Sequence, residues 1–127
     1  MHSHEADWIA HICDPALPEW DRLMKALMAY SDRNGIDLYI GRRIARMLRA
    51  AGLTNIRINP LVHVYEPDHT RRPIFLQFVH NLRDRMIGQG LISEHEFDEC
   101  AASLERHISD PGTFVMSHVF VQAWGRK

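Results

Sequence analysis

The alternation of apolar and polar residues predicts a helix that leads directly into a strand in the middle of the chain. Apolar side chains recur at intervals of three and four, at Ile44, Met47, Leu48 and Ala51, which is the spacing of one helical face. We expect this helix to span residues 41–51, with arginines on its opposite side, and Gly52 to end it in the left-handed conformation. Residues 55–66 then alternate as a strand does, and Pro60 within them indicates a bulge or an edge position.

Similar patterns predict the elements that precede this unit. Residues 7–13 are a short apolar stretch closed by Asp14 and Pro15, which is typical of a strand covered on both faces. Residues 17–33 carry a broad apolar face and are followed by Gly35. We therefore expect a strand at 7–13 and a helix at 17–33.

Two helices and a strand are predicted in the second half of the chain. The helices occupy residues 72–108 and are separated near Gly90. The second of them begins with a capping box, in which Ser93 and Glu96 satisfy amides of the first turn. Residues 113–124 are β-branched and aromatic, which favours a long final strand.

The order of these elements sets the fold class. Strand, helix, helix, strand, helix, helix and strand follow one another in a single domain of residues 1–127. The class is α/β, or α+β for the chain in isolation, with a small three-stranded sheet flanked by about four helices. Roughly 45 residues separate the two long strands, and a connection of that length permits either parallel or antiparallel pairing.

Composition and charge narrow the classes of partner. The 15 basic and 16 acidic residues give a net charge of −1, so we expect neither nucleic acid nor an anionic membrane as a partner. No apolar run reaches the roughly 20 residues of a membrane span, and no signal peptide is recognised. Cys13 and Cys100 lie in apolar segments, as buried thiols of a cytoplasmic protein do. The nine histidines are scattered, and we expect no metal site.

One set of motifs resembles a known family. The residues that carry it are Gly41-Arg42-Arg43-Ile44, Leu48, Ala51-Gly52-Leu53 and the terminal Gln122–Lys127. In this combination and order the chain resembles the C-terminal half of class I S-adenosylmethionine-dependent methyltransferases. The resemblance implies a truncated Rossmann-like fold, in which residues 7–13 are the fifth strand, 55–66 the sixth, and 113–124 a last strand antiparallel beside it.

The resemblance also implies that this chain binds the substrate and that the other half of the enzyme binds the cofactor. Residues 17–33 would be a lid helix over the active-site mouth, and 72–108 a helical insertion that shapes the acceptor pocket. The family binds its cofactor in the other half, through a glycine-rich turn that this sequence lacks. We therefore expect no cofactor for this chain alone and no methyl transfer without a cofactor-binding half. The alternative is a stand-alone module, derived from such an enzyme, that binds a small molecule or a protein.

The fragment interpretation predicts partners. Removal of the neighbouring strands leaves the backbone groups of the first strand and several apolar faces exposed. We expect a homodimer through these surfaces. The other candidate partners are a cofactor-binding methyltransferase half and a small-molecule acceptor.

Five residues form the candidate substrate site. His11 and Asp14 lie at the carboxyl end of the predicted first strand, with Trp20, Tyr39 and Arg43 within reach. A histidine and a carboxylate so placed suit a general base and its orienting partner. Structural roles compete with this interpretation: Asp14 as a helix cap, His11 as a hydrogen-bonded strand residue and Trp20 as core. No catalytic residue is assigned.

Overall fold

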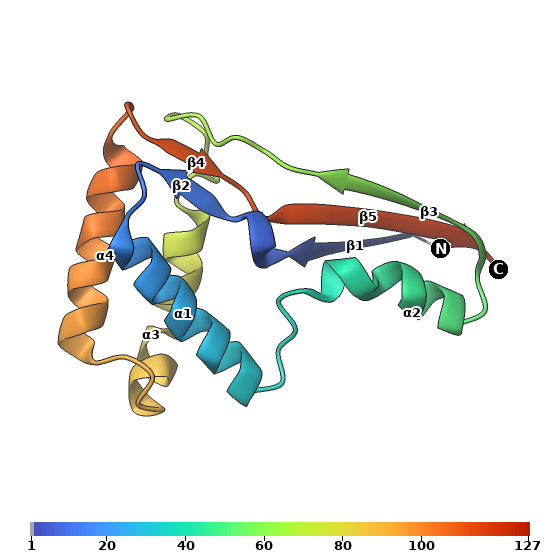
Figure 1. The fold of residues 1–127 in the computed structure, drawn as a ribbon, viewed down its shortest axis with the longest axis horizontal. Coiled ribbons are helices and arrows are strands. Elements are labelled where there is room, and N and C mark those ends of the chain that lie inside the picture. Colours follow the sequence, from blue (N-terminus) through green and yellow to red (C-terminus); the bar gives the residue numbers. More distant parts are fainter. Residues whose placement is uncertain (1) are drawn as a thin grey trace. The chain divides into compact units, whose positions relative to one another are not determined.

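The computed structural model describes residues 2–127, which form two compact units, each assembled from segments far apart in the sequence (Figure 1). The sheet unit comprises the described residues up to Ile12, together with Asp37–His63 and Met116–Lys127. The helical unit comprises Cys13–Ile36 and Val64–Val115.

The sheet unit is built on three strands, β1 (His2–Asp7), β3 (Thr54–Leu61) and β5 (Val119–Arg126). β5 lies between the other two strands and is antiparallel to both. Gln122 of β5 is opposite His4 of β1 on one side and Asn59 of β3 on the other. The structure therefore confirms a small three-stranded sheet whose last two strands are antiparallel.

One face of this sheet is covered by η2 (Ile40–Arg43), a short 3-10 helix, and α2 (Ile44–Ala50), which together replace the single predicted helix 41–51. The core between helix and sheet contains Ile44, Leu48, Leu53, Val121 and Ala123. Gly41 allows η2 to approach β1, because a Cβ at this position would lie 2.9 Å from the carbonyl carbon of Ala6. Gly52 ends the helical segment at a φ of +93°.

The first strand lies earlier than the predicted residues 7–13, so that prediction is wrong in its bounds. β1 ends at Asp7, a 3-10 turn η1 (Trp8–Ala10) follows, and β2 (Ile12–Asp14) is a separate short strand. The turn begins at Asp7 because its carboxylate accepts a hydrogen bond from the backbone N–H of Ile9 at 3.1 Å. β1 has no continuous apolar run, since it is an edge strand whose alternate side chains His2 and His4 are exposed.

The Asp7 carboxylate also binds Arg42 of η2. Arg42 donates to Asp7 from Nε at 2.6 Å and from Nη2 at 3.1 Å, which is the bidentate geometry that suits a guanidinium. This hydrogen bonding to Arg42 lowers the pKa of Asp7, although burial of the carboxylate acts in the opposite direction. Asp7 therefore joins β1, η1 and η2 in one charged contact.

The helical unit contains α1 (Pro18–Arg33), α3 (Ile74–Gly88) and α4 (Glu94–Ser109). Its core includes Trp20, Leu23, Leu27, Phe75, Val79, Phe97 and Leu104, all nearly inaccessible to solvent. Ser93 caps α4 by accepting a hydrogen bond from the Glu96 N–H at 3.1 Å, as the capping box predicts. β2 pairs with β4 (Phe114–Met116) in a separate two-stranded sheet.

The final segment, predicted as one strand over residues 113–124, is divided into β4 and β5. The break falls at Ser117, whose N–H donates to the His63 carbonyl at 2.8 Å, while its hydroxyl donates to the His118 carbonyl at 2.7 Å. The strand is interrupted because these bonds take the place of a regular ladder.

Two other sequence expectations concern the thiols and the membrane. Cys13 and Cys100 are free thiols, half-buried and buried respectively. Burial raises the pKa of Cys13 to about 11 and also raises that of Cys100. Within residues 2–127, no helix combines the length and apolar character needed to cross a membrane.

Candidate functional site

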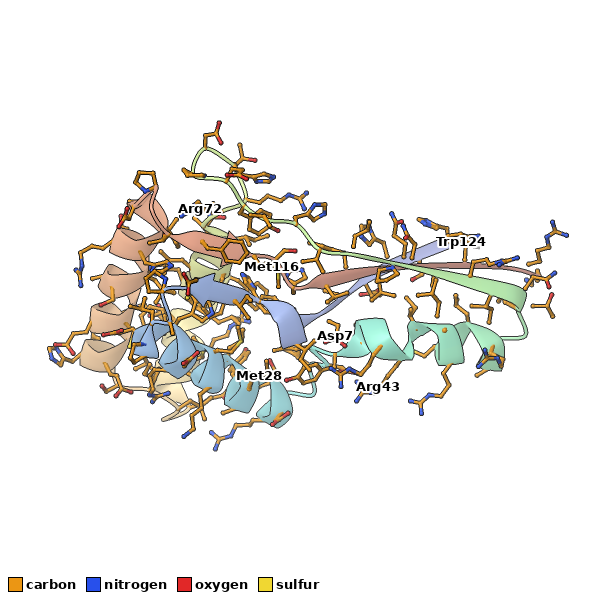
Figure 2. The ribbon with its side chains drawn as sticks, turned by 45° about the horizontal axis from the view of Figure 1, so that its top comes forward. Asp7, Met28, Arg43, Arg72, Met116 and Trp124 are labelled. Carbon is orange, nitrogen blue, oxygen red and sulfur yellow. The ribbon has the colours of Figure 1, made fainter. Side chains whose placement is uncertain are left out.

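A buried arginine organises the loop that leads into α3. Only 2% of Arg72 is exposed, and Figure 2 labels it in the helical unit. Its side chain donates hydrogen bonds to five oxygens: the carbonyls of Tyr65, Ile108, Asp110 and Thr113 and the hydroxyl of Thr113, at 2.6–3.2 Å. One guanidinium thus holds together the loop before α3, the end of α4 and the turn before β4. A lysine lacks the planar fork needed for this set of contacts.

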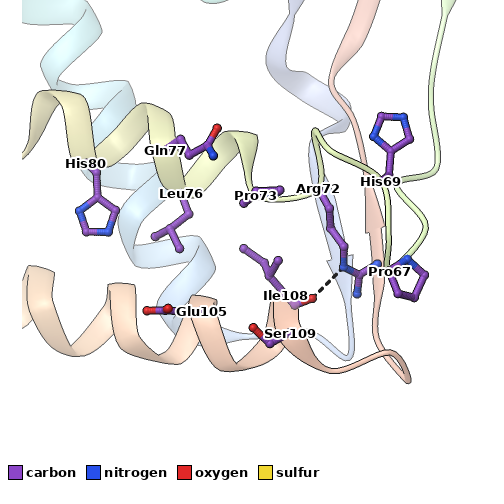
Figure 3. Close-up of a pocket in the computed structure, with 10 residues that line it drawn as sticks. All are labelled: Pro67, His69, Arg72, Pro73, Leu76, Gln77, His80, Glu105, Ile108 and Ser109. Atoms are coloured by element: carbon purple, nitrogen blue, oxygen red, sulfur yellow. Dashed lines mark hydrogen bonds between the residues drawn. The ribbon is translucent and has the colours of Figure 1, made fainter.

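Beside Arg72 lies a pocket of about 490 Å³ between α3 and α4. Apolar parts of its wall come from Pro67, Pro73, Leu76 and Ile108. Figure 3 shows Leu76 on α3 and Ile108 on α4, with the hydrogen bond from Arg72 to the Ile108 carbonyl at one end. The volume lies within the range of small-molecule sites.

Polar groups reach the same pocket from both helices. Gln77 and His80 belong to α3, Glu105 and Ser109 belong to α4, and His69 comes from the loop before α3. Together they offer a carboxylate acceptor, an amide, a hydroxyl and two imidazoles to a ligand. A compact ligand with an apolar body and a hydroxyl or amine group matches this set of donors and acceptors.

The structure places His11 in a cluster of rings within the sheet unit. It is 4% exposed, and its ring centroid lies 5.3 Å from that of Trp8 and 5.5 Å from that of His118. Burial, with a smaller effect of His118, lowers the pKa of His11 to about 3. A base with so low a pKa is neutral and weak at neutral pH, so the structure does not support the general-base role.

The other four candidate residues have separate contacts. Asp14 is exposed at the end of β2, and Trp20 is buried with its ring 4.7 Å from that of Phe75. In the sheet unit, the Arg42 guanidinium lies 4.4 Å from the centre of the Tyr39 ring, and Arg43 pairs with Asp37 at 2.7 Å. These contacts favour the structural role for Trp20 and lend no support to a shared substrate site.

Sequence reasoning missed the pocket beside Arg72. The available signal was the position of Arg72, next to Pro73 at the start of an apolar helix. The structure shows that the side chain of Arg72 is buried rather than exposed to solvent. That signal is weak because the oxygens bound by Arg72 come from positions as far away as Thr113. The resemblance implied only that a helical insertion over residues 72–108 shapes an acceptor pocket, and none of the five candidate residues lines the pocket found here.

The described glycines do not form the turn by which class I methyltransferases, the family that the sequence resembles, bind S-adenosylmethionine. Gly35, Gly52 and Gly90 follow helices and have positive φ, and Gly41 packs against β1. The other three are Gly88 in α3, Gly112 after α4 and Gly125 in β5. Across residues 2–127, no glycine lies in a turn from a strand into a helix, so the phosphate-binding or nucleoside-binding turn of such folds is missing.

The described residues were also compared with the ligand sets of metal sites. Among residues 2–127, no three side chains of the histidine, cysteine, aspartate or glutamate type gather as metal ligands do. Comparison with models of known protein families and with curated proteins found no match.

Proposed function

We propose that this chain is the acceptor-binding, C-terminal part of an S-adenosylmethionine-dependent methyltransferase, and that the pocket between α3 and α4 holds the methyl acceptor. The observation that carries the proposal is the order of elements in the sheet unit. α2 is followed by Ala51 and Gly52 and leads directly into β3, and β5 lies antiparallel beside β3. This is the arrangement that the resemblance implies for the last two strands.

The pocket supports an acceptor-binding role. It combines an apolar wall, including Leu76 and Ile108, with polar groups such as His80 and Glu105. Small-molecule sites are mostly apolar, with a few polar groups that fix the orientation of the ligand. Because methyl transfer depends largely on positioning, a pocket that orients an acceptor is a sufficient contribution from this chain.

The cofactor must then come from another chain or segment. The described glycines lack the turn that would hold it, so this chain by itself is expected to bind an acceptor without transferring a methyl group. A cofactor-binding half, added as a separate chain, is the partner that would complete the enzyme.

The test is an amide NMR titration of the full chain with tyramine and, separately, with S-adenosylmethionine. We expect tyramine, which has one aromatic ring, a hydroxyl and an amine, to shift amide signals in residues 67–80 and 105–109. We expect S-adenosylmethionine to shift none.

A pair of variants sharpens this titration. Gln77→Trp places a bulky side chain at the pocket, whereas Asn81→Trp places it one turn further along α3, at an exposed residue outside the pocket lining. The first variant is expected to abolish the tyramine shifts and the second to retain them. Equal shifts in both variants would contradict the pocket assignment.

The second candidate function is a stand-alone small-molecule-binding or protein-interaction module. The absence of a cofactor-binding turn among residues 2–127 favours it. Light scattering with a separately purified cofactor half of a class I methyltransferase distinguishes the two. A complex that binds S-adenosylmethionine supports the enzyme part, and the absence of any complex supports the independent module.

We also propose that the chain forms a homodimer through an edge of the sheet. β1 is an edge strand, so its outer backbone groups have no strand partner within residues 2–127. The proposed contact therefore moves from the predicted residues 7–13 to His2–Asp7. A monomer in light scattering at micromolar concentration would overturn it.

A further inference from the structure

The sheet unit has a second face, opposite α2, with an unusual composition. Strand register and alternation assign to it the positions His2, His4, Ala6, Arg57, Asn59, Leu61, Phe120, Gln122, Trp124 and Arg126. We call these residues the open face. Figure 2 shows Trp124 on the side of the sheet away from α2. The open face is rich in rings, amides and arginines, in contrast to the aliphatic core on the other side.

Two aromatic rings anchor the open face. Trp124 is 40% exposed, and the His2 ring lies 6.2 Å from it. Phe120 is surrounded by the rings of His4, His63 and His118, at 5.7, 5.6 and 4.3 Å. Between the two aromatic residues, the Asn59 side chain donates to the Gln122 side chain at 2.9 Å. Planar groups and amides are thus arranged along β5 and its two neighbouring strands.

The charges on the open face have a single sign. Arg57 and Arg126 lie beside Trp124 and, together with Asn55 and Gly125, line a hollow of about 390 Å³. Within residues 2–127, neither arginine forms an ion pair. The two carboxylates of these strands, Glu5 and Asp7, alternate onto the other face, where Asp7 binds Arg42.

We infer that the open face binds a single-stranded nucleic acid, with bases stacked on Trp124 and Phe120 and phosphates contacted by Arg57 and Arg126. Aromatic rings on a sheet, flanked by positive groups, are the means by which proteins bind unpaired bases without sequence preference. Asn59 and Gln122 carry amides suited to base edges.

The geometry limits the length and strength of this binding. Trp124 and Phe120 are four residues apart on β5, about 14 Å along an antiparallel strand, which roughly four stacked nucleotides span at 3.4 Å each. Two phosphate contacts predict a slope of log K against log salt of about −1.4. The net charge of −1, which argued against nucleic acid for the whole chain, does not describe the charge of this one face.

The inference does not depend on the proposed enzymatic function, since the open face and the acceptor pocket lie in different units. The probe is a fluorescein-labelled eight-nucleotide oligouridylate at 50 mM salt, followed by anisotropy with the full chain. We expect saturable binding and no more than a tenth of that affinity for a duplex of equal length.

Variants separate stacking from charge. Trp124→Ala is expected to weaken binding about tenfold, whereas Trp124→Phe retains most of it. Arg57→Gln is expected to reduce the salt slope by about 0.7. Arg49→Gln, an exposed arginine on α2, is the matched control and should leave affinity and slope unchanged. Circular dichroism and urea midpoints establish that each variant is folded.

Three results would overturn the inference. The first is no binding at 100 μM chain, and the second is equal affinity for the duplex. The third is concentration-dependent dimerisation that Trp124→Ala abolishes without any oligonucleotide, because a second copy of the chain would then occupy the open face.

Discussion

The two units of this chain differ in how they bury their apolar residues and in where their charged contacts lie. The helical unit surrounds its apolar residues with three helices and fixes the remaining loop by a buried arginine that binds only neutral oxygens. The sheet unit covers one face of its strands with α2 and η2, and its main charged contact, between Asp7 and Arg42, is partly exposed. The two proposals differ accordingly: the pocket between α3 and α4 is proposed to take a compact ligand, and the open face of the sheet an extended one.

The largest effect is expected for Arg72. Arg72→Met removes the donor from several buried carbonyls at once, and we expect it to lower the free energy of unfolding of the helical unit by at least about 3 kcal/mol. Urea denaturation combined with amide exchange of α3 and α4 measures this effect. Arg71→Met is the control because Arg71 is exposed. A change in Arg72→Met no larger than in Arg71→Met would show that the buried arginine is not the anchor of this unit.

A smaller effect is expected for Gly41 in the sheet unit. Gly41→Ala places a Cβ 2.9 Å from the backbone of Ala6, which forces η2 away from β1 and should cost about 1–3 kcal/mol. Loss of amide protection in β1 and β5, with α3 and α4 unchanged, would localise the damage. Gly88→Ala is the matched control, since nothing lies within 4 Å of its added Cβ. Equal thermal midpoints for the two variants would contradict the close approach.

The third prediction concerns pH. The pKa of His11 is about 3 in the folded chain against an ordinary value of 6.5, so between these values the unfolded chain binds the extra proton. The stability that comes from a neutral buried His11 is complete above pH 6.5 and falls as the pH drops toward 3, by as much as about 1.4 kcal/mol per pH unit. The groups that face its ring are Trp8 and His118.

Urea midpoints between pH 7 and pH 4 test this dependence. His11→Gln is expected to flatten the decline, whereas His95→Gln, at a histidine whose side chain is 85% exposed, should leave it unchanged. An identical decline in the wild-type chain and in His11→Gln would assign the acid sensitivity to other groups.

The sequence predicted the helices better than the first strand. α1 and α4 have amphipathic spacing and clear ends, such as the Ser93 cap, and these signals are local. β1 consists of His-Ser-His-Glu-Ala-Asp, and its polarity reflects an edge strand with an open face rather than a loop. The pairing of β5 between β1 and β3 depends on contacts between residues far apart in the sequence, such as Asn59 and Gln122, which no local pattern records.

The residues named from sequence as the candidate site do not line the pocket beside Arg72. The resemblance implied that a helical insertion over residues 72–108 shapes an acceptor pocket, and α3 and α4 of that segment contribute to the pocket beside Arg72. The five residues named from sequence have other contacts. The expected strand 7–13 would have placed His11 and Asp14 at one strand end, whereas His11 follows η1 and Asp14 ends the separate strand β2. Arg72 was missed because its partners lie in three separate segments.

The most direct test of the account is the comparison of two ligands on the same chain. In an amide NMR titration, tyramine is predicted to shift signals around Leu76 and Ile108 in the wild-type chain and not in Gln77→Trp. S-adenosylmethionine is predicted to shift none at 1 mM. Saturable binding of S-adenosylmethionine by this chain alone, or no response of the pocket to tyramine, would contradict the claim that it supplies the acceptor side without the cofactor side.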